Sequence, residues 1–222
     1  MGIIDILFTD LSTTMMIIML VAWLIAVMIA IIPHEFAHAF VAYKMGDDTA
    51  KLSGRMTFNP KAHFDPIGAI CLIVFGFGWA KGVPVNSLRF RNMRKGQICV
   101  SLAGVVTNII LGIIFTIFYT LSVMFLDASV GFYFFLQMLL SYTAILNFVL
   151  AVFNFIPIYP LDGFNFVNAF LQPYNKFERF MQQYGIIFLL IFILTPLSDW
   201  VINGFLSITF YPLFDLVLLI FS

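Results

Sequence analysis

The stretch IIPHEFAHAFVAYKMG, residues 31–46, places two histidines and a glutamate at the end of one of the most apolar runs in the chain. The run begins at residue 13, and residues 13–32 contain no charged side chain. About 20 such residues are enough to cross a hydrocarbon core of about 30 Å, so we predict a transmembrane helix here. The helical pattern continues to Gly46, a residue type that often ends helices. The three polar side chains therefore lie where ionisable groups are costly and usually functional.

The composition of the whole chain agrees with a membrane location. Of its 222 residues, 62% are hydrophobic, 18% are aromatic and 10% are charged. Soluble domains are roughly half apolar and about a quarter charged, so we predict an integral membrane protein. The formal net charge is zero, which argues against nucleic acid as a partner. The start of the chain lacks the basic region of a signal peptide, so we expect the first apolar run to be retained.

Further apolar segments follow the first one. Residues 98–125 and 132–156 are clear transmembrane spans, and residues 184–201 and 205–221 are two more candidates. Residues 66–80 are apolar but short and contain three glycines, which favours a re-entrant segment or a buried strand, with an interfacial helix as the alternative.

These segments predict an all-α membrane protein, a polytopic bundle of four or five transmembrane helices with a short re-entrant or β segment near residues 66–85. We expect a single domain over residues 1–222. Its core covers about residues 13–170, and a C-terminal transmembrane hairpin covers about residues 184–221.

The basic residues predict the orientation of the chain. Nine of the eleven lysines and arginines lie between Lys44 and Lys95, and the other two, Lys176 and Arg179, follow the third long span. By the positive-inside rule both loops are cytoplasmic, so the short turn at Asp127 and the N-terminus are outside.

His34, Glu35 and His38 form the pattern H-E-x-x-H, in which residues i and i+4 share one helix face and can bind one Zn²⁺. Glu35 stands beside the first histidine, where it can act as a base toward water. Counted from Lys44 at 1.5 Å per residue, His38 lies about 9 Å and His34 about 15 Å inside the membrane. This depth favours a metal site over the alternative, a pair of hydrogen-bonded core histidines.

Catalytic zinc takes three protein ligands and keeps one position for water, so a third ligand is expected. Asp162 stands out among the carboxylates because NFIPIYPLDGFN, residues 154–165, interrupts an apolar helix with prolines and a glycine. The third span runs inward from Asp127, which returns its end to the side of H-E-x-x-H. Irregular backbone at this depth is tolerated against protein or a water-filled cavity. We therefore predict Asp162 as the third ligand; the alternative is a helix-terminating turn with a solvated aspartate.

Five segments carry a resemblance to a known family, in the order HEFAH, NPKAHFDPIG, FGWAKGVPVN, SLAGVVTN and NFIPIYPLDG. Together they resemble the site-2 protease family of intramembrane zinc metalloproteases, in its short form without PDZ or CBS domains. The resemblance covers about residues 32–170. The sequence departs from the family's usual pattern at Gly82, where proline is common, and at Val105, where proline follows Ala-Gly.

The resemblance implies a three-helix catalytic core in a prokaryotic cell membrane, with one zinc ion bound by His34, His38 and Asp162. It also implies that Glu35 is the general base and that Asn108 is the family's intramembrane asparagine.

Asn108 has a candidate role that follows from its position. It lies 13 residues beyond Lys95, at a depth similar to that of His34. Its amide could donate to a tetrahedral oxyanion, or it could make a structural hydrogen bond between helices. Asn147 and Asn154 are interpreted as packing residues, and His63 as a loop residue rather than a fourth ligand.

The predicted reaction is hydrolysis of a peptide bond within or near the transmembrane segment of another membrane protein, near the cytoplasmic side. An extended substrate needs a partner edge, which residues 66–85 could offer by β-augmentation. The candidate substrate-binding residues in this region are Gly78, Trp79, Val83 and Val85. The expected partners are the substrate and the lipid bilayer, with a homo-oligomer or a regulatory membrane protein left open.

Two other functions remain as alternatives at this level. A metal or proton-coupled transporter would also contain intramembrane histidines and carboxylates, but it would normally show related halves, and none is visible in the sequence. A non-catalytic zinc-binding membrane scaffold would have no need of Glu35.

Overall fold

The computed structural model describes residues 12–75 and 78–221, and across these residues it contains helices and loops but no strand. Within these described residues, five segments are long and apolar enough to cross a membrane: Thr13–Met45, Met93–Phe125, Gly131–Asn154, Lys176–Leu194 and Pro196–Phe221. The predicted all-α, multi-pass membrane fold is confirmed. The N-terminus, which the sequence places outside the cell, lies outside the described residues.

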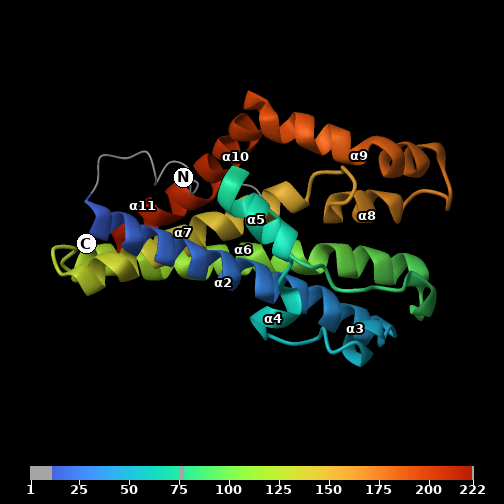
Figure 1. The fold of residues 1–222 in the computed structure, drawn as a ribbon, viewed down its shortest axis with the longest axis horizontal. Helices are drawn as coiled ribbons and strands as arrows, with labels where there is room; N and C mark the ends of the chain where they lie inside the picture. Colours follow the sequence, from blue (N-terminus) through green and yellow to red (C-terminus); the bar gives the residue numbers. More distant parts are fainter. Residues whose placement is uncertain (1–11, 76–77, 222) are drawn as a thin grey trace.

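The helices follow one another in a simple order (Figure 1). They are α2 (Thr13–Met45), α3 (Thr49–Leu52), α4 (Pro60–His63), α5 (Pro66–Phe75), the 3₁₀ helix η1 (Ser87–Arg89), α6 (Met93–Phe125), α7 (Gly131–Asn154), α8 (Asp162–Asn168), α9 (Lys176–Leu194), α10 (Pro196–Ile208) and α11 (Phe210–Phe221).

Helices α2, α6 and α7 lie side by side and form the centre of the molecule (Figure 1). α10 and α11 pack against α7 and α6, and α9 packs against α10. Many large apolar side chains of the long helices remain exposed, among them Ile110 and Phe118 of α6. Such an outward apolar surface suits contact with lipid rather than with water.

The buried face of α6 shows why these helices approach one another closely. Every fourth residue is buried along this helix: Gly96, Val100, Gly104, Asn108, Gly112, Thr116 and Thr120. Residues four apart lie on one helix face, and small residues at such a face allow neighbouring backbones and side chains to come near. A Cβ atom at Gly112 would lie 3.0 Å from the ring of Phe148 on α7. The small residues of α6 thus make room for side chains of the neighbouring helices.

The predicted end of the first helix is confirmed at Gly46. Its φ of 112° lies in the left-handed region, and its N–H donates to the carbonyl of Tyr43. The next residue, Asp47, donates its N–H to the carbonyl of Ala42. A glycine adopts this conformation without steric cost, so the helix stops where the sequence predicts.

The short apolar segment after Asp65 is a helix and not a strand, which corrects the β alternative of the prediction. α5 has ten residues, and Ile67 and Ile70 on it are more than half exposed. Asp65 caps it by accepting the N–H groups of Ile67 and Gly68. With its own end capped and its backbone bonded within the helix, this segment offers no strand edge.

The C-terminal helices begin and end at other residues than predicted. The break lies at Thr195, between α9 and α10, rather than near residues 202–204. Thr195 has an extended ψ of 156°, because a following proline disfavours helical backbone at the residue before it. Pro196 then begins α10, a position where its missing N–H costs nothing.

Candidate metal centre

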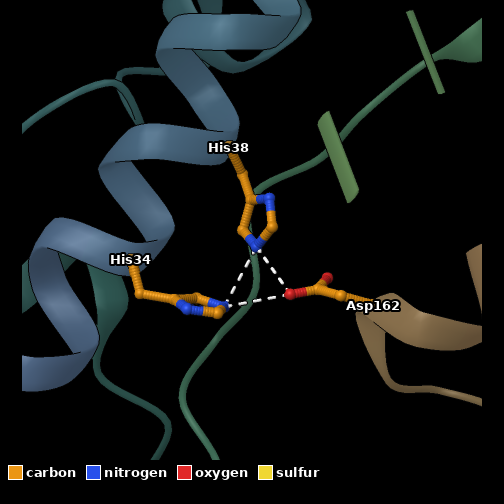
Figure 2. Close-up of side chains that lie close together, drawn as sticks. All are labelled: His34, His38 and Asp162. Carbon is orange, nitrogen blue, oxygen red and sulfur yellow. Dashed lines mark hydrogen bonds and ion pairs between the residues drawn. The ribbon is translucent and has the colours of Figure 1, made fainter. Parts of the chain in front are cut away.

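Two histidines of α2 and one aspartate of α8 meet at a single point (Figure 2). His34 and His38 are both buried, and their Nε2 atoms lie 3.0 Å apart. Asp162 Oδ2 lies 3.3 Å from Nε2 of His34 and 3.1 Å from Nε2 of His38. The structure thus brings together the three side chains that the sequence predicts as ligands.

The turn before α8 presents Asp162 to the histidines. α7 ends at Asn154, and residues 155–161 reverse the chain so that α8 begins with this aspartate. Gly163 permits the turn, since a Cβ atom there would lie 2.2 Å from the carbonyl oxygen of Phe155. The sequence Pro-Leu-Asp-Gly therefore folds back on the end of α7 and directs the carboxylate toward α2.

The other ring nitrogens of the two histidines are occupied. Nδ1 of His38 donates to the carbonyl of Val100 on α6 at 2.8 Å, because a carbonyl can only accept. Nδ1 of His34 lies 2.5 Å from Oδ1 of Asn108, also on α6. A neutral imidazole carries one N–H, so both rings present a lone pair at Nε2 to the common point.

This arrangement of atoms fits a zinc ion. With the proton of each ring on Nδ1, two nitrogen lone pairs and one carboxylate oxygen converge, and Asp162 Oδ2 accepts no hydrogen bond from any described residue. Tetrahedral zinc with bonds of about 2.0–2.1 Å holds its ligand atoms about 3.3–3.4 Å apart, close to the observed 3.0–3.3 Å. Since three acceptors repel one another in a buried site, a cation is the natural partner.

A cavity of about 450 Å³ opens beside these three side chains. The other residues that line it are Glu35, Gly82, Val83, Val85, Ser87, Phe90, Gln97, Val100, Ser101, Asn154, Pro160 and Asn165. Polar groups from α2, α6, α7 and α8 therefore face one space next to the candidate metal site. This space is large enough for several atoms of a peptide backbone and a water molecule.

Glu35 lies at the wall of this cavity, next to an extended segment. Its Oε2 accepts the backbone N–H of Val83 at 2.9 Å. The segment is also held just before Val83, because Lys81 donates its N–H to the carbonyl of His63 and Arg55 donates to the carbonyl of Gly82. Residues 81–83 are therefore held against the predicted base by main-chain hydrogen bonds.

Asp47 fixes the far end of the same segment. This fully buried carboxylate accepts the N–H of Asn86 at 2.6 Å and the N–H of Thr49 at 3.0 Å. Burial by itself would raise the pKa of Asp47, but the hydrogen bonds from Thr49 and Asn86 outweigh it and hold the pKa below its usual value. The carboxylate therefore stays ionised and keeps residue 86 against the end of α2.

The predicted substrate-binding residues separate into two groups. Val83 and Val85 line the cavity. Gly78 instead packs against α5, where a Cβ atom would lie 2.2 Å from the carbonyl oxygen of Gly68, and Trp79 is about half exposed beside it. The positions of the two valines are consistent with contact to a substrate in the cavity. Gly78 instead allows the close contact with α5.

Asn108 is buried and fully bonded, which bears on its predicted role. Its Nδ2 donates both to the carbonyl of Ala30 at 3.1 Å and to Oδ1 of Asn147 at 2.7 Å. Its Oδ1 faces His34. With both N–H groups already donated, this amide is arranged to orient the histidine rather than to stabilise an oxyanion.

Some residues of the site are not apparent from motif spacing. Gln97, Ser101 and Asn165 line the cavity, and Gly104 lies directly against His34. The signal that could have found Gly104 is the repeat of small or polar residues every four positions along α6. The sequence-based interpretation considered the asparagine of this stripe but not its glycines.

Replacing Gly104 by alanine is expected to displace His34. A Cβ atom at this position would lie 2.3 Å from Cε1 of the imidazole, too close for any real contact, and displacement of a catalytic group by about 1 Å can cost about 10²-fold in rate. We expect the variant to lose zinc affinity, measured by competition with a chelator on purified protein. Gly204→Ala is the matched control, because a Cβ atom there meets nothing within 4 Å. Equal zinc affinity in both variants would contradict the expected displacement.

The chain is similar in sequence to a known protein family and to several known proteins. Residues 130–192 match the family described as Peptidase family M50. The chain is 40% identical over 171 residues to the protein named "Putative zinc metalloprotease YwhC" of Bacillus subtilis, an overlap that covers 76% of this chain and 78% of that protein.

Two mycobacterial proteins, each named "Putative zinc metalloprotease Rip2", are also similar. The one from Mycobacterium tuberculosis H37Rv is 30% identical over 82% of this chain and 69% of its own length. The one from Mycolicibacterium smegmatis is 27% identical over 75% of this chain and 64% of its own length. No solved structure matches the chain.

Proposed function

Because the chain belongs to peptidase family M50 and its relatives are named zinc metalloproteases, we propose that it cleaves peptide bonds within or near the transmembrane segments of other membrane proteins. The observation that carries this proposal is the position of the candidate metal centre. His34 and His38 lie in a helix long enough to span the bilayer, and Asp162 reaches them from the end of another span. A peptide bond processed there has to come from a segment that is itself in or at the membrane.

Each residue of the site has a specific part in the proposed reaction. His34, His38 and Asp162 would hold the zinc ion, since their Nε2, Nε2 and Oδ2 atoms face one another. When bound, zinc would polarise the scissile carbonyl and lower the pKa of water to about 7. Glu35, on the cavity wall, accepts the proton of the attacking water and donates it to the leaving amine. The carbonyl of Val100 and the amide of Asn108 keep the two imidazoles in the orientation that ligation needs.

Substrate binding is proposed for the extended segment beside Glu35. A helical substrate has its carbonyls in internal hydrogen bonds, so it has to unwind before one can be attacked. Gly82, Val83 and Val85 line the cavity in an irregular segment outside the helices, and an extended peptide laid along such backbone can exchange main-chain hydrogen bonds with it. We also propose that α2 to α8 act as the catalytic core of a single domain and that α9 to α11 form its C-terminal hairpin.

The proposed function is tested with purified protein and a single-pass membrane protein as substrate. Wild-type protein reconstituted in lipid vesicles is expected to cleave the substrate, to stop when a chelator removes the metal, and to recover when zinc is added back. Cleavage that continues at the same rate in metal-free protein would contradict a zinc-dependent reaction.

The proposed topology places the metal centre near the cytoplasmic side and predicts the exposure of two serines. Ser87 in η1 lies within the basic loop between Lys44 and Lys95, whereas Ser129 lies in the turn between α6 and α7, which has no basic residue. In a variant without Cys71 and Cys99, we expect Ser129→Cys to react with a membrane-impermeant thiol reagent in intact cells. Ser87→Cys is expected to react only after the cells are opened. The reverse pattern would invert the topology.

A further inference from the structure

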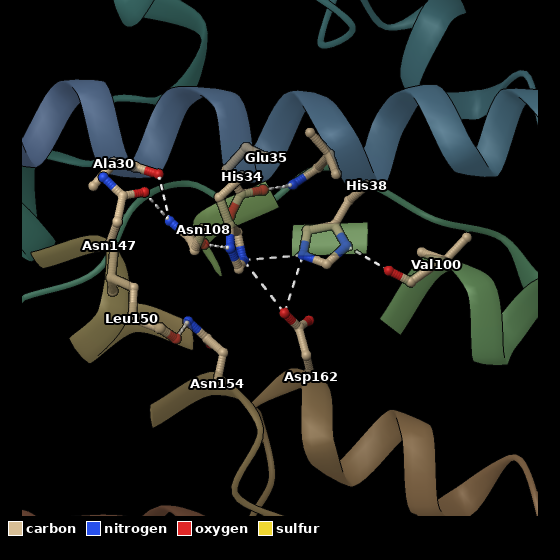
Figure 3. A network of polar contacts seen from close by, with 11 residues as sticks. Ala30, His34, Glu35, His38, Val100, Asn108, Asn147, Leu150, Asn154 and Asp162 are labelled. Atoms are coloured by element: carbon tan, nitrogen blue, oxygen red, sulfur yellow. Dashed lines mark hydrogen bonds and ion pairs between the residues drawn. The ribbon is translucent and has the colours of Figure 1, made fainter. Parts of the chain in front are cut away.

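A chain of buried amides lies behind the metal centre, between α6 and α7 (Figure 3). Asn108 and Asn147 are both fully buried. Asn108 Oδ1 lies 2.5 Å from Nδ1 of His34, and its Nδ2 donates to Oδ1 of Asn147 at 2.7 Å. Asn147 in turn donates its Nδ2 to the carbonyl of Thr143 at 2.8 Å. One continuous series of hydrogen bonds therefore connects α7 to the imidazole of α2.

The direction of this series is fixed by two main-chain carbonyls. The carbonyl of Ala30 can only accept, and it lies 3.1 Å from Nδ2 of Asn108, so the amide nitrogen has to face α2 at this point. The carbonyl of Thr143 fixes the nitrogen of Asn147 in the same way, which turns the Asn147 oxygen toward Asn108. A rotated Asn108 amide would set its oxygen against the oxygens of both Ala30 and Asn147.

The orientation of Asn108 decides which nitrogen of His34 carries the proton. With the Asn108 oxygen facing it, Nδ1 has to be the donor, and Nε2 keeps its lone pair. With a rotated amide, an N–H group would face Nδ1 and favour the other tautomer. The proton would then sit on Nε2, the atom that faces His38 and Asp162. A protonated Nε2 cannot ligate a metal ion.

We propose that Asn147 is a positioning residue of the metal centre, which holds the Asn108 amide in the orientation that keeps Nε2 of His34 free for zinc. The proposal rests on the proposed function, because it takes His34 as a zinc ligand. It replaces the sequence-based interpretation of Asn147 as a packing residue. Asn147 acts through Asn108 and does not itself contact the predicted ligand atoms of His34, His38 and Asp162.

The affinity for zinc is the first test. The full chain is purified in detergent, and zinc affinity is measured by competition with a chelator. Asn147→Leu, which keeps the branching of the side chain but has no hydrogen-bonding group, is expected to bind zinc about 10-fold more weakly, within the range typical for partners of metal-ligating histidines. Thr143→Val is the matched control, because Thr143 is also fully buried one turn earlier on α7 and its hydroxyl donates to the carbonyl of Leu139 in its own helix. The control is expected to bind zinc as the wild type does.

A double variant distinguishes two ways in which Asn147 could affect zinc binding. One is action through Asn108, which we call the relay, and the other is an independent effect on packing. Asn108→Leu is expected to weaken zinc binding by about 10- to 100-fold. If Asn147 acts only through Asn108, the double variant Asn108→Leu/Asn147→Leu binds zinc as weakly as Asn108→Leu alone. Additive losses of affinity would show that Asn147 acts independently and would overturn the proposal.

The tautomers provide a readout that requires neither zinc nor activity. The chain contains three histidines, so nitrogen NMR of protein labelled at histidine and freed of metal gives few signals. His34 and His38 are expected to carry the proton on Nδ1, whereas His63, whose Nε2 donates to the carbonyl of Thr57, is the internal reference for the opposite tautomer. Asn147→Leu is expected to shift His34 toward a mixture and to leave His38 unchanged. An unchanged His34 would overturn the proposal.

Failure of the relay and failure of the metal assignment give different results. If the wild type binds no zinc, the metal site is wrong and the relay falls with it. If the wild type and Asn147→Leu bind zinc equally tightly, the relay alone is wrong. Should Asn147→Leu not fold, Asn147→Ser carries the same expectations, since a serine hydroxyl can bond its own helix but is too short to reach Asn108.

Discussion

Glu35→Gln protein is expected to bind zinc as tightly as the wild type and to cleave a single-pass test substrate about 10²- to 10⁴-fold more slowly. The substitution keeps the shape of the side chain but removes its basic oxygen. The amide oxygen of glutamine can still accept the N–H of Val83, which Glu35 accepts at 2.9 Å, so the segment beside the cavity is expected to stay in place. Loss of cleavage with unchanged zinc would therefore report the loss of a general base.

This variant also separates the protease from the two other functions that the sequence left open. A metal or proton-coupled transporter is expected to keep its flux in Glu35→Gln protein, and a scaffold is expected to keep its partner. The measurement pairs the cleavage rate with zinc content in the same preparation. Equal cleavage rates for wild-type and variant protein at equal zinc content would make the hydrolytic role of Glu35 wrong.

Asp162→Asn is expected to weaken zinc binding itself. The loss of affinity is expected to exceed the about 10- to 100-fold that is typical when a hydrogen-bond partner of a metal ligand is replaced. The substitution replaces an anionic ligand by a neutral one beside a divalent cation in a buried site. Oδ2 of Asp162 lies 3.1–3.3 Å from both histidine nitrogens, so an N–H group at that position would point its hydrogens at the cation. Cleavage is expected to fall in parallel with zinc content.

The control for Asp162→Asn is the same substitution at an exposed carboxylate. Asp199 lies in the first turn of α10, and Asp199→Asn removes one negative charge from the chain without touching the site. Zinc affinity is measured for both variants by chelator competition. If the two variants bind zinc equally well, Asp162 is not a ligand.

The two variants have different signatures. Glu35→Gln lowers the rate at constant zinc, whereas Asp162→Asn lowers zinc binding first and the rate as a consequence. Added zinc is expected to restore part of the activity of Asp162→Asn protein and none of the activity of Glu35→Gln protein. The same response of both variants to added zinc would remove the distinction between base and ligand.

Local patterns in the sequence predicted much of the fold. Long runs without charge indicated the helices that can cross a membrane, because burying charge in lipid is costly and each helix satisfies its own backbone. The spacing of His34 and His38 placed both rings on one face of α2, since residues four apart are neighbours on any helix. Gly46 ended α2 as predicted, because its role depends only on its own backbone. These features follow from short segments, whatever packs around them.

The prediction was wrong where a short segment has more than one stable form. Residues 66–75 are apolar enough for a strand or a helix, and α5 formed because Asp65 caps it and the described residues around it provide no strand to pair with. The tail was divided at the wrong residue, because hydropathy gave no weight to the restriction that Pro196 places on Thr195.

The sequence by itself determined that this is a helical membrane protein with H-E-x-x-H in its first span, and it indicated Asp162 as a third ligand. Only the tertiary structure decided how the centre is supported. It places Gly104 in close contact with His34, and it brings the N–H of Val83 into a hydrogen bond with Glu35. It also brings Asn147 into a hydrogen bond with Asn108. Each of these contacts joins residues at least 39 positions apart. Local periodicity depends on neighbours in the chain, whereas a hydrogen bond or close contact between distant helices depends on how those helices pack, which no local pattern specifies.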